Sequence, residues 1–473
     1  MTSPAKDSPA CSTAIEFLYE RLNYERFEQP GHTLDPFKLD QMVELLKRLD
    51  NPQDKLRIVH IAGTKGKGST SVFVSAMLTA AGYRTGCYTS PHLARIEERF
   101  AMDGQSCTSE ELVELVELVR PAVTAMDEAA RRERRDGPTF FEVTTAMAFL
   151  YFVRRQADYV VLEVGLGGRL DSTNVCHPLL CIITTISFDH MRQLGNTLAL
   201  IAGEKAGIIK PHIPVVTGVT QEEPWTVIRD IAASRHAPLW QLGRDFDFDY
   251  HAPRWASGSQ DARSVPRFDY YHVHDGQRTL VARDIELSAW GHHQAANATV
   301  AWSACERLRD LGLELPESAM RAGLLAARCS GRVEILPGSP VVLIDTAHNG
   351  ASIDALVAVL RDSFPQQPKG LILAATQGKD VDAMLHPLVR DFDIVCCTRY
   401  LENPRGMPAD ELTRHARRIA TAEGSLADLF TADSPREAWE KMSRRIPPAG
   451  LLCATGSFFL AAELKQVIGP GTS

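Results

Sequence analysis

The chain has 473 residues, 44% of them hydrophobic, and a formal net charge of −8. This length predicts two or three domains with sizeable cores, and the acidic balance argues against nucleic acid as the main partner, because surplus Lys and Arg hold phosphate backbones. Ten cysteines without CxxC pairs, the absence of a signal-peptide core and the absence of a membrane-length apolar run indicate a reduced, cytoplasmic chain without disulfides, zinc or membrane contact.

The first half of the chain alternates predicted helices and apolar strands. Residues 35–49 place five apolar side chains on one helical face: Leu39, Met42, Leu45, Leu46 and Leu49. Further helices are predicted at 70–82 and 197–209, and strands at 56–62, 84–90, 157–164, 179–187 and 213–218. Strands that are apolar throughout and alternate with helices indicate a parallel sheet covered on both faces.

The pattern changes between residues 244 and 290. Apolar and polar residues alternate there, and Asp275-Gly276 is a hairpin signal. We predict a small antiparallel lobe whose aromatic residues pack against the protein and do not stack on bases, followed by a helix at 294–312.

A second series of strands begins near Ser330. It comprises residues 341–345, 370–375, 392–397 and 450–455, which are separated by helical stretches. We therefore predict two domains: residues 1–329 with an N-terminal helical segment, and a smaller doubly wound domain at 330–473.

The stretch HIAGTKGKGSTS, residues 60–71, is similar to a phosphate-binding loop but departs from the usual pattern. That pattern ends in Gly-Lys-Ser/Thr, whereas here Lys67 is followed by Gly68 and the hydroxyl comes at Ser69. Between a strand and a helix, glycines let backbone N–H groups approach a phosphate, and the helix N-terminus adds positive charge. We predict a variant phosphate loop; the alternative is a tight turn with exposed lysines. The candidate nucleotide ligands in the loop are Thr64, Gly66, Lys67, Gly68, Ser69 and Thr70.

Polar residues follow several of the predicted parallel strands. Ser90 and Glu163 lie at the ends of two strands, and Asp189 and His190 come just after a third. The carboxyl ends of parallel strands share one edge, where ligands bind, so these side chains are candidate Mg²⁺ ligands beside the loop. Imidazole is an unusual magnesium ligand, which makes His190 the weakest member on chemistry alone.

The second domain offers a similar set. Asp345 and His348 follow a strand, and Arg332 at the start of that domain could close onto a nucleotide held by the first. Ser457 could cap a helix or bind a carboxylate. Lys205 lies in a helical stretch, and nothing in its local sequence selects it.

Taken together, these motifs resemble the folate branch of the Mur ligase superfamily, which comprises folylpolyglutamate synthases and bifunctional dihydrofolate synthases. The resemblance covers nearly the whole chain, in order: FKLDQMVELLKRLDNP, GTKGKGS, YTSPHLARIEERF, LEVGLGGRLDSTN, FDHMRQLG, EKAGIIK, GHHQAAN, GRVE, DTAHN and TGS. It implies a P-loop Mur-ligase-type central domain with a parallel sheet and a small antiparallel lobe, and a Rossmann-like C-terminal domain.

The resemblance also assigns metal and modification sites. It implies ATP on the glycine loop, Mg²⁺ on Ser90, Glu163 and His190, and a carbamylated Lys205 that joins a second Mg²⁺. The assignment of His190 as a Mg²⁺ ligand therefore depends on the resemblance and not on the chemistry of imidazole.

Further nucleotide contacts are implied by the same resemblance. Asn297 should lie near the adenine, and Arg332 and Asp345 should meet the nucleotide from the second domain. Residues 165–174 correspond to the family's omega-type loop beside the folate site. Three residues depart from the family pattern, which usually has Asn, Gly and Pro there: Lys65, Thr346 and Gly350.

The implied activity is ATP-dependent ligation of L-glutamate to a folate or dihydropteroate carboxylate through an acyl phosphate, with Lys67, Lys205 and His348 as catalytic residues. We expect a monomer. Two alternatives stay open: a Mur-type ligase acting on a peptidoglycan precursor, and an ATP-binding homologue without catalysis.

Overall fold

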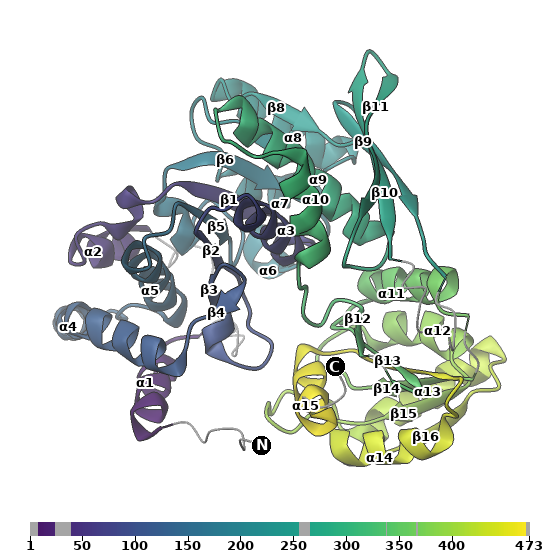
Figure 1. The fold of residues 1–473 in the computed structure, drawn as a ribbon. Helices are drawn as coiled ribbons and strands as arrows, with labels where there is room; N and C mark the ends of the chain where they lie inside the picture. The colour runs from purple at the N-terminus through teal and green to yellow at the C-terminus, as the bar shows by residue number, and fades with distance from the viewer. Residues whose placement is uncertain (1–7, 24–38, 255–264, 337, 366–367, 470–473) are drawn as a thin grey trace. The chain divides into compact units, whose positions relative to one another are not determined.

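The computed structural model describes residues 8–23, 39–254, 265–336, 338–365 and 368–469. The chain divides into two compact units (Figure 1). The first unit contains Met1–Asp249, Asp269–Ile285 and Ala296–Ala327, and the second contains Tyr250–Phe268, Glu286–Ala295 and Arg328–Ser473. Residues 35–38 of the first predicted helix lie outside the described residues. No helix in the described ranges has the length and apolar character needed to cross a bilayer.

The first unit is built on an eight-stranded sheet in the order β4-β3-β2-β5-β1-β6-β7-β8. Its strands are β1 (Ile58–Ala62), β2 (Thr85–Tyr88), β3 (Phe100–Met102), β4 (Gln105–Ser106), β5 (Tyr159–Glu163), β6 (Pro178–Ile183), β7 (Val215–Thr217) and β8 (Leu239–Gln241). Six neighbouring strands run parallel: β2, β5, β1, β6, β7 and β8. At one edge, β3 pairs antiparallel with β2 and with β4. All five residues of the central strand β1 are buried, which confirms the predicted parallel sheet.

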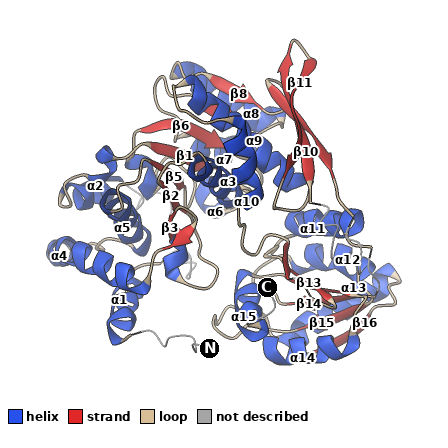
Figure 2. Ribbon diagram, viewed as in Figure 1, coloured by secondary structure: helices blue, strands red, loops and turns tan. Residues whose placement is uncertain are grey.

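Helices cover this sheet (Figure 2). They are α1 (Pro9–Tyr19), α2 (Leu39–Lys47), α3 (Lys67–Ala80), α4 (Ser109–Glu133), α5 (Phe140–Arg154), α6 (Met191–Leu194), α7 (Leu198–Ala206), α8 (Glu222–Ser234), α9 (His292–Asp310) and α10 (Glu317–Ala326), with short 3₁₀ turns at Pro52–Lys55, Ile96–Arg99 and Ser172–Val175. Ile58 and Val160 share a core with α4 and α5, and Ala62 and Ile183 share one with α7 and α8. Helix α3 contacts β1, β2 and β5 and is itself covered by α10.

A three-stranded sheet carries the predicted lobe. Its order is β11-β10-β9, with β9 at Phe246–His251, β10 at Arg267–His274 and β11 at Gln277–Glu286. Asp275 and Gly276 both have positive φ, 47° and 76°, as a two-residue hairpin turn requires, so the predicted hairpin is confirmed. Tyr270 is buried and packs on Trp302 at 6.0 Å, in agreement with a packing role for the aromatic residues. Part of the lobe, 255–264, lies outside the described residues.

The second unit holds a six-stranded sheet in the order β12-β13-β17-β14-β15-β16, parallel except for the β12–β13 pair. Its strands are β12 (Glu334–Leu336), β13 (Val341–Ile344), β14 (Lys369–Leu373), β15 (Ile394–Cys397), β16 (Asp428–Thr431) and β17 (Leu451–Thr455), and its helices are α11 (Gly350–Ser363), α12 (Val381–Asp391), α13 (Ala409–Glu423), α14 (Pro435–Arg445) and α15 (Phe458–Ile468). Leu371 and Leu373 pack with α11, α12 and α13, whereas a Cβ on Gly370, which points to the other face, would meet Met442 of α14. Both faces are therefore covered, as predicted for a doubly wound domain.

One buried imidazole links the central strand to the loop after β5. His60 in β1 is fully buried; its Nε2 lies 2.9 Å from the hydroxyl of Thr173, and its Nδ1 lies 3.7 Å from the Sγ of Cys176. Asp171 accepts hydrogen bonds from the backbone N–H groups of Leu166 and Thr173. Burial, followed by the charge of Lys210, lowers the pKa of His60 from 6.5 to about 3.

This imidazole is expected to make the protein acid-sensitive. Below pH 6.5 the imidazole of His60 is protonated in the unfolded chain, whereas in the folded chain it stays neutral down to about pH 3. The free energy of unfolding therefore falls as the pH drops between these two values. Between pH 7 and pH 5 the loss from this group is about 2 kcal/mol. His60→Gln should lower stability at pH 7 but lose about 2 kcal/mol less over that interval, measured by urea unfolding. His274→Gln, at an imidazole 94% exposed, is the control; an equal acid loss in wild type and His60→Gln would contradict the prediction.

Candidate active site

The glycine loop connects β1 to α3, and its second half belongs to the helix. Helix α3 begins at Lys67, and Gly66 is its N-cap with a left-handed φ of 85°. A Cβ on Gly66 would lie 2.2 Å from Oδ1 of Asn297, and a Cβ on Gly68 would lie 3.5 Å from Oε2 of Glu163. Glycine at 66 is therefore required both by conformation and by space, and Asn297 of α9 lies directly beside the loop.

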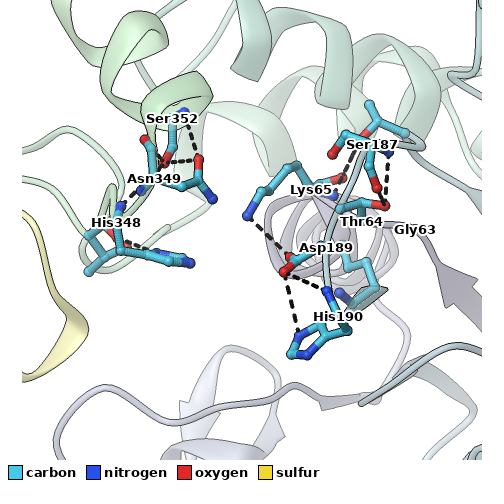
Figure 3. A network of polar contacts seen from close by, with 12 residues as sticks. Gly63, Thr64, Lys65, Ser187, Asp189, His190, His348, Asn349 and Ser352 are labelled. Carbon is cyan, nitrogen blue, oxygen red and sulfur yellow. Dashed lines mark hydrogen bonds and ion pairs between the residues drawn. The ribbon is translucent and has the colours of Figure 1, made fainter. Parts of the chain in front are cut away.

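The loop is fastened to the segment that follows β6. The N–H of Thr64 donates to the carbonyl of Thr185 at 2.7 Å, and the N–H of Lys65 donates to the hydroxyl of Thr185 at 3.2 Å. The hydroxyl of Thr184 donates to the carbonyl of Lys65 at 2.6 Å. Figure 3 shows how the hydroxyl of Thr64 bridges the N–H and carbonyl of Ser187, at 3.1 and 3.2 Å. Thr64 therefore anchors the loop, and the Thr-Thr pair that ends CIITT is the sequence signal for this contact.

The two remaining loop hydroxyls differ in their surroundings. Ser69 and Thr70 lie in the first turns of α3 and are both buried. The Oγ1 of Thr70 has no hydrogen-bond partner among the residues that the structure describes, and it is closed off from solvent. Ser69 keeps a small exposed fraction of 6%, so it is the hydroxyl better placed to meet a ligand.

Two lysine–carboxylate contacts flank the loop. Nζ of Lys67 lies 4.0 Å from Oε1 of Glu163, the last residue of β5, and the other Glu163 oxygen accepts the N–H of Ser90 at 3.2 Å. Nζ of Lys65 lies 3.4 Å from Oδ2 of Asp189. The structure thus brings Lys67, Glu163 and Ser90 together at the carboxyl edge of the sheet, where sequence reasoning placed them.

His190 lies beside Asp189 at the same edge. It has a left-handed φ of 48° and forms the N-cap of α6. Its N–H donates to the side chain of Asp189 at 3.1 Å (Figure 3), and its side chain is about half exposed. The predicted strand at 179–187 ends at Ile183 in the structure, because Thr184, Thr185 and Ser187 form hydrogen bonds with the glycine loop instead.

Lys205 is a buried cation in the last turn of α7. Its Nζ donates to the carbonyl of Gly63 at 2.9 Å. Burial, followed by the charge of Lys67, lowers the pKa of Lys205 to about 7. The loop after β5 supports this end of α7, because the N–H of Arg169 donates to the carbonyl of Glu204 at 2.7 Å. The tertiary structure therefore selects a lysine that its local sequence did not.

The predicted metal ligands can hold Mg²⁺ only together with oxygen atoms from phosphate groups and water. Within the described ranges, no three His, Cys, Asp or Glu side chains gather into a metal-binding group. Glu163 and the backbone of Ser90 are in contact, which suits an ion that binds one or two carboxylates together with phosphate oxygens and water. A carbamate on Lys205 would add a second oxygen ligand. The donor set therefore fits magnesium on a nucleotide, and it does not fit an all-protein cage.

The second unit gathers its own polar residues at the carboxyl ends of β13 and β17. Asp345 is buried and accepts the N–H groups of Val333 and Ala347, at 2.9 and 2.7 Å. Burial raises the pKa of this carboxyl, while the charge of Arg332 and the two N–H groups oppose the rise.

Phe458, which sequence reasoning did not select, lies between two of the predicted residues. The guanidinium of Arg332 lies 5.1 Å from the centre of its ring, and the ring of His348 lies 5.6 Å from it. Nδ1 of His348 is 2.9 Å from the carbonyl of Thr346. Ser457 accepts the N–H of Phe459 at 3.1 Å, so of its two predicted roles the helix cap is confirmed.

Comparisons with known proteins identify both parts of the chain. Residues 61–305 match the family model of the Mur ligase middle domain, and residues 335–467 match that of the dihydrofolate synthetase C-terminal domain. The chain is 39% identical over 352 residues to the dihydrofolate synthase/folylpolyglutamate synthase of Bacillus subtilis, which covers 74% of this chain and 78% of that protein. It is 33% identical to the folylpolyglutamate synthase of Lacticaseibacillus casei over 92% of this chain and 95% of that protein. The structure of Mycobacterium tuberculosis folylpolyglutamate synthase complexed with ADP and AMPPCP superposes with a TM-score of 0.82 and 30% identity over 99% of this chain and 100% of that chain.

Proposed function

Because the chain belongs to the dihydrofolate synthase/folylpolyglutamate synthase family of Mur ligases, we propose how its own residues carry out that family's reaction. The protein is an ATP-dependent ligase that joins glutamate to a folate or pteroate carboxylate. The observation that carries the assignment of the site is the contact of Lys67 with Glu163 at the carboxyl edge of the sheet, beside a glycine loop that opens α3.

In the proposed reaction, a carboxylate oxygen of the folate attacks the γ-phosphorus of ATP, and ADP leaves. The N–H groups at the start of α3 and the ammonium of Lys67 hold the phosphates and stabilise the charge of the transferring group. Ser90, Glu163 and His190 would hold Mg²⁺, which when bound neutralises phosphate charge. Asn297, which lies beside the loop, is the proposed contact to the adenine, and Arg332 and Asp345 are further proposed contacts to the nucleotide.

In the second step, the amine of glutamate attacks the acyl carbon, and phosphate leaves as the amide forms. The amine must lose a proton before or during this attack. We assign the proton acceptor to His348. Its Nδ1 lies on the carbonyl of Thr346, which favours the tautomer with hydrogen on Nδ1 and leaves Nε2 as the basic atom. Water must be kept from the acyl phosphate during this step, because water would hydrolyse it.

Lys205 would act as a carbamate. A neutral lysine amine adds carbon dioxide and releases a proton, which converts a cation into an oxygen ligand for a second Mg²⁺. Its burial, its position at the Gly63 carbonyl and its lowered pKa support this assignment. An uncarbamylated ammonium would instead repel a metal ion placed beside Lys67.

Two pterin substrates are candidates to accept the glutamate. Both dihydrofolate synthase and folylpolyglutamate synthase are represented among the relatives, and we propose that the chain glutamylates both dihydropteroate and tetrahydrofolate. A monomeric state, a cytoplasmic location and independence from nucleic acid remain predictions from the sequence.

Product masses should decide the acceptor. Purified protein with ATP, Mg²⁺ and L-glutamate is expected to add one glutamate to dihydropteroate and a ladder of glutamates to tetrahydrofolate, with one phosphate released per bond. Turnover with only one acceptor would restrict the function to that half. Glutamate-dependent phosphate release with neither pterin, but with a UDP-linked muramyl substrate, would overturn the folate assignment, and no release at all would point to a silent homologue.

A further inference from the structure

Lys65 is a cation of the glycine loop to which the reaction described above gives no role. Its backbone is held at both ends: the N–H donates to the hydroxyl of Thr185, and the carbonyl accepts the hydroxyls of Thr184 and Thr185, at 2.6 and 3.1 Å. Its side chain leaves this fixed base and reaches Oδ2 of Asp189 at 3.4 Å (Figure 3). Asp189 directly precedes the predicted metal ligand His190 in the chain, so the ammonium of Lys65 lies beside that part of the predicted site.

Each of the two loop lysines has a carboxylate from another segment beside it. Lys65 lies against Asp189 and Lys67 against Glu163, at 3.4 and 4.0 Å. A nucleotide with Mg²⁺ brings opposite partners for both members of each pair, because phosphates attract ammonium groups and the metal ion attracts carboxylates. Each pair can therefore separate on nucleotide binding without leaving an unpaired charge.

The Lys65–Asp189 pair is also weak enough to separate. The side chain of Lys65 is 36% exposed and that of Asp189 is 26% exposed, and ion pairs with such exposure contribute between about 0 and 1 kcal/mol. A charge-assisted contact of lysine with a phosphate oxygen is stronger than that. The fixed backbone of Lys65 limits the movement to its flexible side chain.

We propose that Lys65 exchanges partners during nucleotide binding: Asp189 holds its ammonium in the nucleotide-free protein, and the terminal phosphate of ATP takes it when the triphosphate enters. Lys65 is then a second phosphate contact that favours ATP over ADP, and Asp189 is a resting competitor for it. The inference rests on the proposed phosphate loop and adds to it a lysine that the proposed reaction leaves without a role.

A double-mutant cycle read by calorimetry tests the exchange. The affinities of AMPPCP and ADP are measured for the wild type, Lys65→Asn, Asp189→Asn and the double variant, with Mg²⁺ and again in EDTA. Lys65→Asn is expected to weaken AMPPCP about tenfold and ADP less than about threefold. Asp189→Asn is expected to tighten AMPPCP about threefold in the wild-type background and to change nothing in the Lys65→Asn background, since the ammonium for which Asp189 competes is then absent. The same pattern in EDTA shows that the effect does not pass through the metal.

Lys55→Asn, which removes the same charge from an exposed site, controls for net charge and should leave both affinities unchanged. The proposal is overturned if Lys65→Asn binds AMPPCP within twofold of the wild type, if ADP loses as much as AMPPCP, or if Asp189→Asn has the same effect in both backgrounds. If any of these results came with normal glutamate-dependent turnover, the partner exchange would be wrong and the ligase function would still hold. If the double-mutant cycle showed the expected coupling in a protein without glutamate-dependent turnover, the exchange would hold and the ligase function would be wrong.

Discussion

Lys67→Ala is expected to lower glutamate-dependent turnover by at least about a thousandfold, which corresponds to about 4 kcal/mol of lost transition-state stabilisation. The lysine opens α3, and its ammonium lies 4.0 Å from Glu163 at the carboxyl edge of the sheet. Phosphoryl transfer depends on positioning and charge neutralisation, so removal of this cation acts on the step that forms the acyl phosphate. The measurement is phosphate release at saturating ATP, together with the affinity for AMPPCP.

The fold should survive this change, because the side chain is partly exposed and outside the hydrophobic cores. Circular dichroism and urea unfolding should therefore match the wild type. Lys55→Ala, at an exposed lysine outside the site, is the matched control and should keep full turnover. Retention of more than about a tenth of the rate in Lys67→Ala would show that the loop does not carry the chemistry.

Lys205→Met is expected to lower turnover by at least about a hundredfold, because the variant cannot carry the carbamate that would hold the second metal ion. Methionine suits this site, since Lys205 is 4% exposed and an apolar chain of similar length fills the same space. Loss of activity would therefore not reflect a cavity. Native mass spectrometry of the wild type in bicarbonate should show the added mass of one carbon dioxide, which Lys205→Met should lack.

Two further variants separate charge from packing at this position. Lys205→Arg keeps a cation that cannot be carbamylated and should be as inactive as the methionine variant. Lys205→Glu supplies a carboxylate on a shorter side chain and should recover part of the rate. Wild-type turnover in Lys205→Arg, or an unmodified wild-type lysine under bicarbonate, would contradict the carbamate.

The fold followed closely from the sequence wherever the signal was local and strong. The buried strands β1, β5, β6, β13 and β17 are mainly apolar runs, and their positions agree within a few residues with those predicted. Edge strands such as β4 and β16 were not assigned, because two to four residues on a sheet border carry little pattern.

The sequence interpretation also assigned no helix between residues 109 and 154. The capping boxes that open α4 and α5, Thr108 with Glu111 and Thr139 with Glu142, are signals that could have located both helices. The start of α3 was placed at residue 70 although it lies at Lys67, because the glycines concealed the first turn.

The amino-acid sequence by itself determined the two mainly parallel sheets, the glycine loop, the order of motifs that points to the family, and the polar residues at the strand ends. These features depend on side-chain type and spacing along the chain. Only the tertiary structure decided that Lys205 is buried at the Gly63 carbonyl, that Asp189 faces Lys65, and that Thr184 and Thr185 fasten the loop. The reason is physical: burial, and the charges that surround a group, are set by segments more than a hundred residues away, which meet only when the strands assemble side by side.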